Sequence, residues 1–225
     1  MTRAVAVPLG YLMNGIYNLI GNYGLSIIIM TIIIRLIILP LYSMQLKSTE
    51  QMQAIQPKIK EIQAKYKDTP EKMNEKIQEL YQEHKVRPAM GCLPLLIQLP
   101  IIWGLFGLLR NPMTYITNPD MVLSVHESFL WIHDLSQPDL WILPIIAGIA
   151  TYISMKITTS GTAAAGANAS MKAMQYFMPV MIVWMGRTLP AGLCIYWVMS
   201  YIFQIGQTKV IHMRKKAKEN KAKEK

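Results

Sequence analysis

The sequence is poor in charged residues and in the groups that enzymes use for catalysis. Only 16% of its 225 residues are charged, and it contains four histidines and two cysteines. The histidines are scattered without metal-ligand spacing, and no Ser/His/Asp set or glycine-rich phosphate loop is visible. Cys92 and Cys194 have no CxxC or Cys/His setting, so we interpret both as packing residues. We therefore expect no enzymatic activity, no metal site and no small-molecule cofactor.

Basic residues are absent from one long segment and concentrated in two others. From Asn111 to Asp139 there is no Lys or Arg, but there are four acids. Nine of the 23 Lys and Arg lie between Gln45 and Pro88, and eight lie after Gln207. Because Lys- and Arg-rich loops of membrane proteins stay in the cytoplasm, we expect the two basic segments inside the cell and the acidic segment outside.

Long apolar stretches make up much of the rest of the chain. Hydrophobic residues account for 52% of the sequence, and a bilayer-spanning helix needs about 20 apolar residues. We predict an all-α, multi-pass membrane protein with five transmembrane helices, an external N-terminus and a cytoplasmic C-terminus. The predicted spans are residues 24–44, 91–110, 139–156, 171–188 and 191–211. The remaining segments are an external interfacial amphipathic segment (1–23), a cytoplasmic helical hairpin (45–88), an external connector (111–138), a cytoplasmic flexible loop (157–170) and a basic cytoplasmic tail (212–225).

The hairpin is predicted from two runs of helical periodicity. Asp68-Thr69-Pro70 separates them, since Thr suits an N-cap and Pro the first position of a helix. Two such helices form an antiparallel pair with an apolar seam. Charged residues cover the outside, so a purely structural, solvated hairpin is an equally good interpretation. The seam positions are Met52, Ile55, Ile59, Ile62 and Tyr66 in the first run, and Met73, Ile77, Leu80 and His84 in the second.

One formal charge, Arg35, lies in the middle of the first predicted span. A charge at the bilayer centre costs at least ~2.5–3.5 kcal/mol, and no apolar stretch supplies an internal Asp or Glu to pair with it. The middle of a span is a long reach for a side chain that would snorkel to the interface. We therefore expect Arg35 to face a water-filled cavity that receives an acidic group. The other candidates for its wall are Thr31, Gln98, Tyr152, Ser154, Tyr201 and Gln204.

Methionines recur at helical spacing along the fourth predicted span. Three of them, Met174, Met178 and Met181, suggest an apolar surface that re-packs around varied partners, because the Met side chain is flexible and polarizable. Ordinary helix packing explains any single Met equally well.

Four stretches together resemble the YidC/Oxa family of membrane protein insertases. They are IIIRLIILPL (32–41), QLKSTEQMQAIQPKIKEIQAKYK (45–67), GCLPLLIQLPIIWGLF (91–106) and LPAGLCIYWVMSYIFQIGQT (189–208). Any one of these motifs is weak, but their order and spacing are highly specific. The resemblance implies a bacterial plasma membrane protein with five spans around a hydrophilic groove, open to the cytoplasm and to lipid and closed outside.

The resemblance also implies roles for particular residues. Arg35 would draw in the short acidic external tail of a nascent membrane protein, with Gln98 and Trp197 lining the groove. The hairpin and the basic tail would receive the nascent chain and the ribosome, or the general secretion channel. In one departure, Met155 precedes the Lys that ends the third span, where relatives commonly have Gln. Tyr152 or Ser154 would then supply the polar lining at that depth.

We therefore predict a membrane protein insertase and folding helper that performs no covalent chemistry. The alternatives are a small anion or small-molecule transporter with Arg35 as the substrate site, and a membrane scaffold whose hairpin binds partners. Against the transporter, the sequence has no internal repeat and no pair of matching broken helices. The basic tail suits anionic lipid or nucleic acid, and its composition does not separate the two.

Overall fold

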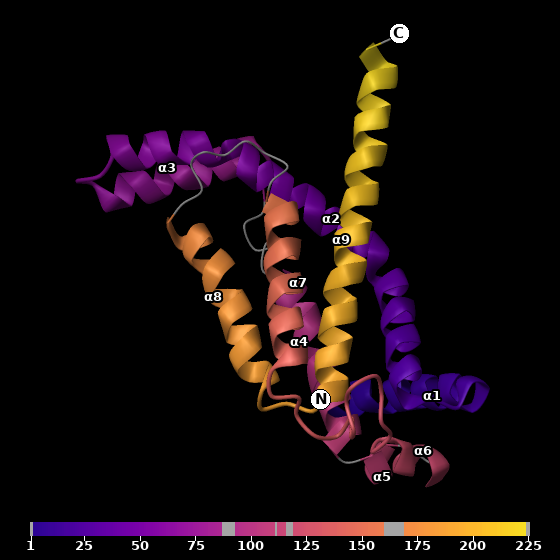
Figure 1. Cartoon of the computed structure of the whole chain (residues 1–225). Helices are drawn as coiled ribbons and strands as arrows, with labels where there is room; N and C mark the ends of the chain where they lie inside the picture. The colour runs from indigo at the N-terminus through magenta and orange to yellow at the C-terminus, as the bar shows by residue number, and fades with distance from the viewer. Residues whose placement is uncertain (1, 87–92, 111, 116–118, 160–168, 224–225) are drawn as a thin grey trace.

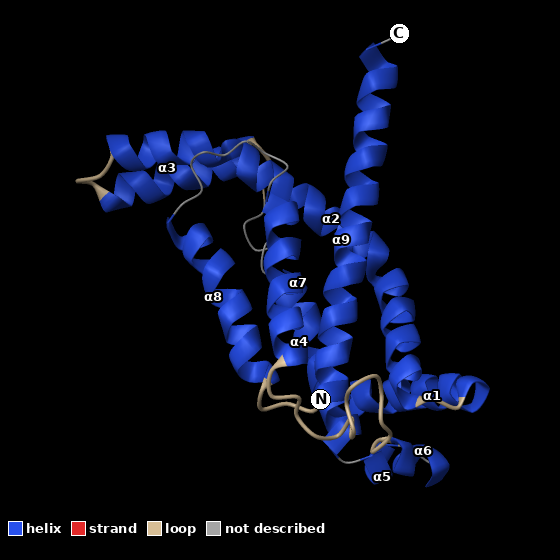
Figure 2. Cartoon of the chain, viewed as in Figure 1, coloured by secondary structure: helices blue, strands red, loops and turns tan. Residues whose placement is uncertain are grey.

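Helices make up nearly all of the described chain. The structure, a computed structural model of the whole chain, describes residues 2–86, 93–110, 112–115, 119–159 and 169–223. Within these ranges no strand is present, so the prediction of an all-α protein is confirmed for them (Figure 2). In chain order the helices are α1 (Thr2–Ile20), α2 (Tyr23–Lys65), α3 (Pro70–Glu83), α4 (Leu93–Arg110), α5 (Pro112–Tyr115), α6 (Pro119–Ser124), α7 (Ile142–Thr159), α8 (Ala169–Gly186) and α9 (Ala191–Lys223).

Two helices are longer than the predicted segments that they contain. The 43-residue α2 runs from the first predicted span into the first arm of the hairpin without a break at residue 44, passing through Pro40 and Pro57. The 33-residue α9 likewise joins the fifth predicted span to the basic tail. Extending an existing helix needs no new nucleus, so a change from apolar to charged sequence does not by itself end one.

The other predicted spans correspond to separate helices with slightly shifted ends. The third and fourth, 139–156 and 171–188, overlap α7 and α8. Residues 91–92 of the second predicted span, and residues 160–168 of the predicted flexible loop, lie outside the described residues.

A two-residue turn joins α1 to α2, and α1 lies across the N-terminal end of α2 (Figure 1). Gly21 has a φ of +66°, a left-handed conformation that favours glycine, and its N–H donates to the Tyr17 carbonyl at 2.7 Å. Asn22 then caps α2, because its Oδ1 accepts from the Leu25 N–H at 2.9 Å. The chain therefore changes direction sharply between the two helices.

The hairpin consists of the second half of α2 packed against α3. Thr69 occupies the N-cap of α3, and Pro70 is its first residue. A small apolar cluster joins the arms, formed by buried Ile55, Ile59, Leu80 and Val86 with half-buried Met52, Ile62, Ile77 and Tyr81. This cluster is separate from the main core of the protein.

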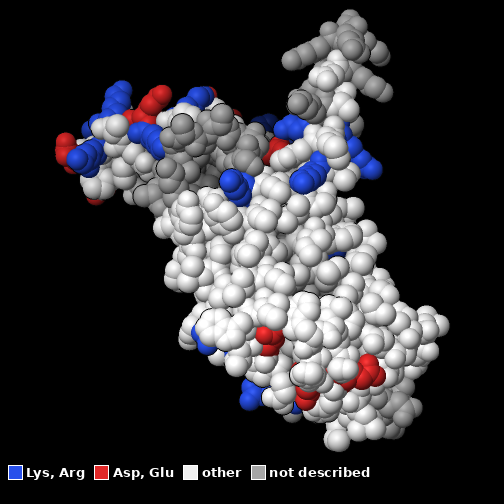
Figure 3. Space-filling view, viewed as in Figure 1, with Lys and Arg blue, Asp and Glu red and all other residues white. Residues whose placement is uncertain are grey.

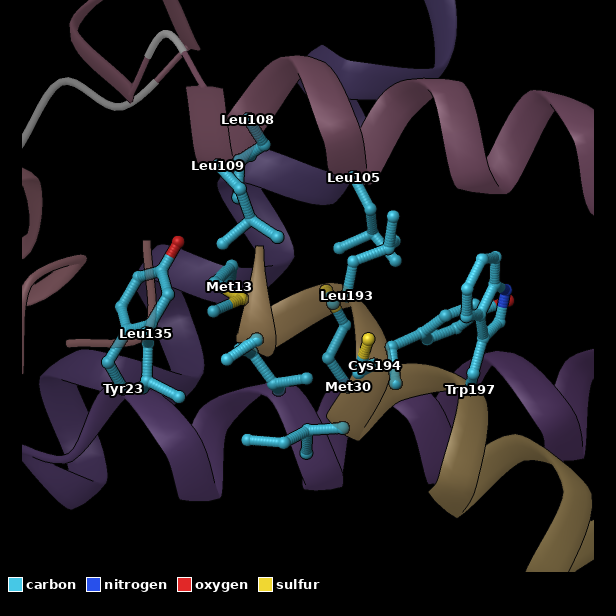
Figure 4. Close-up of a cluster of buried hydrophobic side chains, with 14 of the residues drawn as sticks. Met13, Tyr23, Met30, Leu105, Leu108, Leu109, Leu135, Leu193, Cys194 and Trp197 are labelled. Atoms are coloured by element: carbon cyan, nitrogen blue, oxygen red, sulfur yellow. The ribbon is translucent and has the colours of Figure 1, made fainter. Parts of the chain in front are cut away.

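The main core fills one end of the upright helices, where α1, α2, α4 and α9 meet (Figure 4). Met13, Tyr23, Leu105, Leu135 and Leu193 are each fully buried there. Close packing extends to the backbone, since a Cβ at Gly24 would lie 2.3 Å from the Phe129 ring. This end is tightly filled by side chains from several segments.

Residues 119–141 satisfy helix ends at the same end of the molecule. Glu127 Oε2 accepts from the Tyr23 N–H at 2.9 Å, and its Oε1 accepts from the Tyr17 hydroxyl at 2.9 Å. Asp139 accepts from the backbone N–H groups of residues 141, 142 and 143 at 3.0–3.2 Å. The first N–H groups of a helix have no partner within the helix, so these two acids cap α2 and α7.

The start of α9 is satisfied by backbone rather than by carboxylates. The Ala191 N–H donates to the Gln137 carbonyl at 2.8 Å, and the Gly192 N–H donates to the Leu135 carbonyl at 3.0 Å. Three long helices therefore have their N-termini bound by one connecting segment.

Candidate functional site

Arg35 is half-buried on α2, within the apolar half of that helix. Figure 3 shows charged side chains gathered at the two ends of the molecule, with an almost uncharged belt between them. The Gln207 amide donates to the backbone carbonyl of Arg35 at 3.2 Å, which fastens α9 to α2 at this level. Among the described residues no carboxylate lies within ion-pair distance of Arg35.

Two tyrosines of α9 lie within electrostatic range of Arg35. These are Tyr196 and Tyr201. The Tyr196 hydroxyl accepts a hydrogen bond of 2.7 Å from the Gln98 amide on α4. The Tyr201 hydroxyl lies near the side chain of Thr151 on α7. Side chains from α2, α4, α7 and α9 thus form one polar group around the arginine, which we call the Arg35 site.

The polar character continues from the Arg35 site toward the hairpin and the end of α9. Gln45, Ser154, Gln207 and Thr208 are all less than 9% exposed. Tyr42 and Thr208 share a hydrogen bond of 2.6 Å between α2 and α9. Within the described part of the chain, Ser154 Oγ and Gln207 Oε1 have no hydrogen-bond partner. Buried oxygens of this kind are costly unless a polar group or water reaches them.

Of the predicted lining residues, Gln98 and Tyr201 lie in the Arg35 site, and Gln204 and Ser154 lie nearby on α9 and α7. Gln204 is half-buried, and its carbonyl accepts from the Thr208 hydroxyl at 2.8 Å. Ser154 is 1% exposed.

Two predicted residues lie in the apolar core instead. Thr31 is fully buried, and its hydroxyl donates to the Ile27 carbonyl of its own helix at 2.6 Å. Trp197 is 2% exposed and belongs to the main hydrophobic cluster.

Of the remaining predicted residues, Tyr152 lies between α7 and α8. The rings of Tyr152 and Tyr176 are 6.0 Å apart, at the edge of an apolar cavity of about 300 Å³ between the two helices. Met178 and Met181 are half-buried on α8, and the side chain of Met174 lies outside what the structure describes. This cavity and the Arg35 site are lined by different side chains.

Tyr196 and Thr151 are members of the Arg35 site that the sequence prediction did not include. Tyr196 is followed by Ser200 and Gln207 at intervals of four and seven residues, which places these three on one helical face. That polar stripe was a usable signal. The prediction uses the neighbouring stripe that begins at Trp197, and sequence alone does not say which of two adjacent faces meets Arg35.

The fold and the Arg35 site define a helical membrane protein with an isolated positive charge in a polar setting. The sequence matches the family model described as 60Kd inner membrane protein over residues 15–219. It is 42% identical over 214 residues to Membrane protein insertase YidC 2 of Listeria innocua, covering 92% of this chain and 70% of that protein. It is 40% identical over 204 residues to Membrane protein insertase YidC of Caldanaerobacter subterraneus, covering 90% and 91%.

Further comparisons agree. Membrane protein insertase MisCA of Bacillus subtilis is 40% identical over 215 residues, covering 93% of this chain and 78% of that protein. A crystal structure described as an active YidC insertase with its first transmembrane domain resolved superposes with a TM-score of 0.70 at 32% identity. It covers 92% of this chain, which spans 46% of the solved chain. The chain therefore belongs to the 60Kd inner membrane protein (YidC/Oxa) family, and the predicted insertase function is confirmed.

Proposed function

We propose that this insertase moves the short acidic external tail of a nascent membrane protein into the bilayer by way of the Arg35 site. The observation that carries the proposal is a guanidinium in an apolar stretch, grouped with tyrosine and glutamine side chains and without a carboxylate partner among the described residues. In a low-dielectric setting such a charge attracts an anion strongly. The counter-charge arrives with the client and leaves with it.

The proposed topology has five spans, α2, α4, α7, α8 and α9, with the N-terminus outside and the C-terminus inside a bacterial plasma membrane. Only α2 among the described helices is both long and apolar enough to span by length and composition, while the apolar stretches Ala4–Ile20, Gln98–Arg110 and Ile142–Thr158 are shorter. At 1.5 Å per residue, the 18 residues of α4, α7 and α8 each extend about 27 Å. That length approaches the ~30 Å of a hydrocarbon core, and the uncharged belt in Figure 3 supports the assignment.

The proposed groove opens to the cytoplasm and to lipid and is closed outside. Its polar lining consists of Arg35, Gln98, Tyr201, Gln204 and Ser154, to which the structure adds Tyr196 and Thr151. Buried oxygens without partners on Ser154 and Gln207 favour entry of water from the cytoplasmic side. The filled apolar core at the other end supports closure outside. The apolar cavity beside Tyr152, together with Met178 and Met181, would accept the apolar segment of the client.

The proposed cytoplasmic partners are the ribosome, the general secretion channel and anionic lipid. The hairpin and the end of α9 present basic side chains at one end of the molecule (Figure 3). Glu50 joins them, since its carboxylate lies 2.6 Å from Lys215 Nζ and 3.2 Å from His212 Nε2. This pairing holds the basic helix beside the hairpin, so both surfaces meet a partner together.

The test replaces Arg35 in a strain depleted of its own insertase. Arg35→Ala should abolish insertion of a single-span client with an acidic external tail, and Arg35→Lys should restore most of it, because the role depends on charge. Protease protection of the tail measures insertion. Full insertion with Arg35→Ala would contradict the electrostatic role and leave the family assignment untouched.

A matched client controls for general damage. The same client with its tail Asp and Glu changed to Asn and Gln should insert equally well through the wild type and Arg35→Ala. Equal loss for both clients would mean that Arg35 acts on stability rather than on the tail. Arg35-dependent flux of a small anion into liposomes would favour the transporter.

A further inference from the structure

A second arginine lies beside a cavity at the opposite end of the bundle from the hairpin. This cavity, of about 330 Å³, lies where α4 ends, between the connecting segment and the turn from α8 to α9. Its polar side includes Arg110, His126, Ser136 and Thr188, and its apolar side includes Phe106 and Leu109. We call it the Arg110 cavity.

Arg110 brings a positive charge that the described residues leave unmatched. It is the exposed last residue of α4, with its guanidinium 5.3 Å from the centre of the Phe106 ring. No carboxylate of the described chain lies within ion-pair distance of it. The ring contact uses one face of the guanidinium, so the N–H groups at its edge can donate to an anion.

His126 offers a hydrogen-bond acceptor at the cavity wall. Its Nδ1 lies 3.1 Å from Asp134 Oδ2 and 3.0 Å from Ser136 Oγ. Because both contacts involve Nδ1, they leave Nε2 for a ligand, and they exclude a Ser-His-Asp relay, which needs both ring nitrogens. Burial favours a raised pKa for Asp134, but hydrogen bonds from Ser136 and His126 outweigh burial and hold that pKa below its usual range. The Asp134 oxygens are thus occupied by Ser136 and His126, and Arg110 is left to bind an anion.

We propose that the Arg110 cavity binds a phosphate ester of the kind found in a phospholipid headgroup. Arg110 would hold the phosphate oxygens, since a guanidinium matches phosphate geometry with paired N–H donors. The His126 Nε2, which is an acceptor while Nδ1 donates to Asp134, would accept from a hydroxyl of the glycerol part. Phe106 and Leu109 would contact the glycerol part. The cavity is larger than a bare phosphate requires and lies at the proposed external membrane surface, at the level where headgroups reside. This function is independent of the Arg35 site and would anchor the external end of α4.

The test measures lipid binding to the purified full chain in detergent. Native mass spectrometry would count phosphatidylglycerol molecules retained by the wild type, Arg110→Gln, Arg110→Lys and Arg187→Gln. Losing a charge-assisted contact should weaken binding by about tenfold or more in Arg110→Gln, with substantial retention in Arg110→Lys. Circular dichroism would check that each variant stays folded.

Arg187→Gln is the matched control. Arg187 is also an exposed external arginine following a spanning helix, but its guanidinium stacks 4.2 Å from the Trp141 ring and does not line the cavity. Its replacement should leave retention close to that of the wild type. Unchanged binding in Arg110→Gln, or equal loss in both variants, would overturn the proposal.

A competition experiment distinguishes a phospholipid headgroup from a soluble phosphate ester as the ligand. If soluble glycerol phosphate fails to displace phosphatidylglycerol from the wild type, the ligand is a lipid headgroup. If glycerol phosphate binds with Arg110 dependence and phosphatidylglycerol does not, the site takes a soluble phosphate ester, which also supports the proposal. Absence of Arg110-dependent binding for both compounds would refute it.

Discussion

The two ends of the helical bundle bury different kinds of side chain. The end beside α1 contains Met13, Tyr23, Leu105 and Leu193, all fully buried in one apolar cluster. Toward the end that carries the hairpin, the buried side chains include Gln45, Thr151, Ser154, Gln207 and Thr208. Two helices, α2 and α9, supply members of both sets.

The difference follows from what covers each end. At the end beside α1, α1 and residues 119–141 pack against the long helices and cap their first turns. At the other end, α2 turns aside into the hairpin and α9 continues upward (Figure 1). The first end is therefore covered by further segments of the chain, and the second end is not covered in this way.

The largest expected effect on stability comes from opening a void at the end of the bundle beside α1. Leu193→Ala removes a fully buried side chain and should cost about 2–5 kcal/mol of unfolding free energy. Ile202→Ala on the same helix is the control, since Ile202 is 50% exposed. Thermal unfolding in detergent compares them, and equal losses would remove the distinction between the two ends.

The next effect concerns the cap that Asp139 provides to α7. Asp139→Ala should cost about 0.5–2 kcal/mol at neutral pH, as for other N-caps. Burial favours a raised pKa for Asp139, but hydrogen bonds from Trp131 and from the backbone of residues 141–143 hold it below the usual value. A carboxyl with a depressed folded pKa stabilises the protein above its unfolded pKa, and that contribution is lost as pH falls through the folded pKa.

The variant should thus be less stable than the wild type at neutral pH, and the gap should close only well below about pH 4. Unfolding midpoints across an acid titration would measure the gap. Asp68→Ala, in the exposed turn of the hairpin, should show no comparable gap. A gap that persists at the lowest pH would rule out the carboxylate cap as its cause.

The smallest expected effect on stability comes from removing the Tyr196 hydroxyl, and this change should also reduce client insertion. Tyr196→Phe removes the hydrogen bond with Gln98 and should cost about 0.5–1.5 kcal/mol. Insertion of an acidic client should fall, because the hydroxyl belongs to the Arg35 site. Tyr42→Phe removes a similar buried bond, to Thr208, farther from Arg35. Equal insertion defects in both variants would show that any loosening of α9 suffices.

Sequence reasoning predicts what depends on local pattern. The helical class, the unpaired Arg35 and six apolar positions of the hairpin seam follow from composition and periodicity. Tyr81 and Val86 belong to the seam without having been predicted, and predicted Tyr66, Met73 and His84 are not part of its apolar cluster. The end of the first span could not be placed, because α2 passes through Pro40 and Pro57 without ending. The sequence also did not predict that Tyr196, rather than Trp197, belongs to the Arg35 site. Adjacent positions on a helix differ by only about 100° of rotation, and packing decides which of them meets the site.

The acids of residues 111–139 show the same limit of sequence reasoning. The absence of Lys and Arg from this segment predicts an external location. That Glu127 would cap a helix starting more than a hundred residues earlier depends on a contact that no local pattern encodes.

The unbroken course of α2 has a mechanical consequence. At 1.5 Å per residue, its 43 residues extend about 65 Å, from the external caps past Arg35 to the tip of the hairpin. Its bends are expected at Pro40 and Pro57, because proline removes a backbone hydrogen bond from the helix. A displacement of the hairpin would therefore reach the segment that carries Arg35 through the same helix, by way of the bend expected at Pro40.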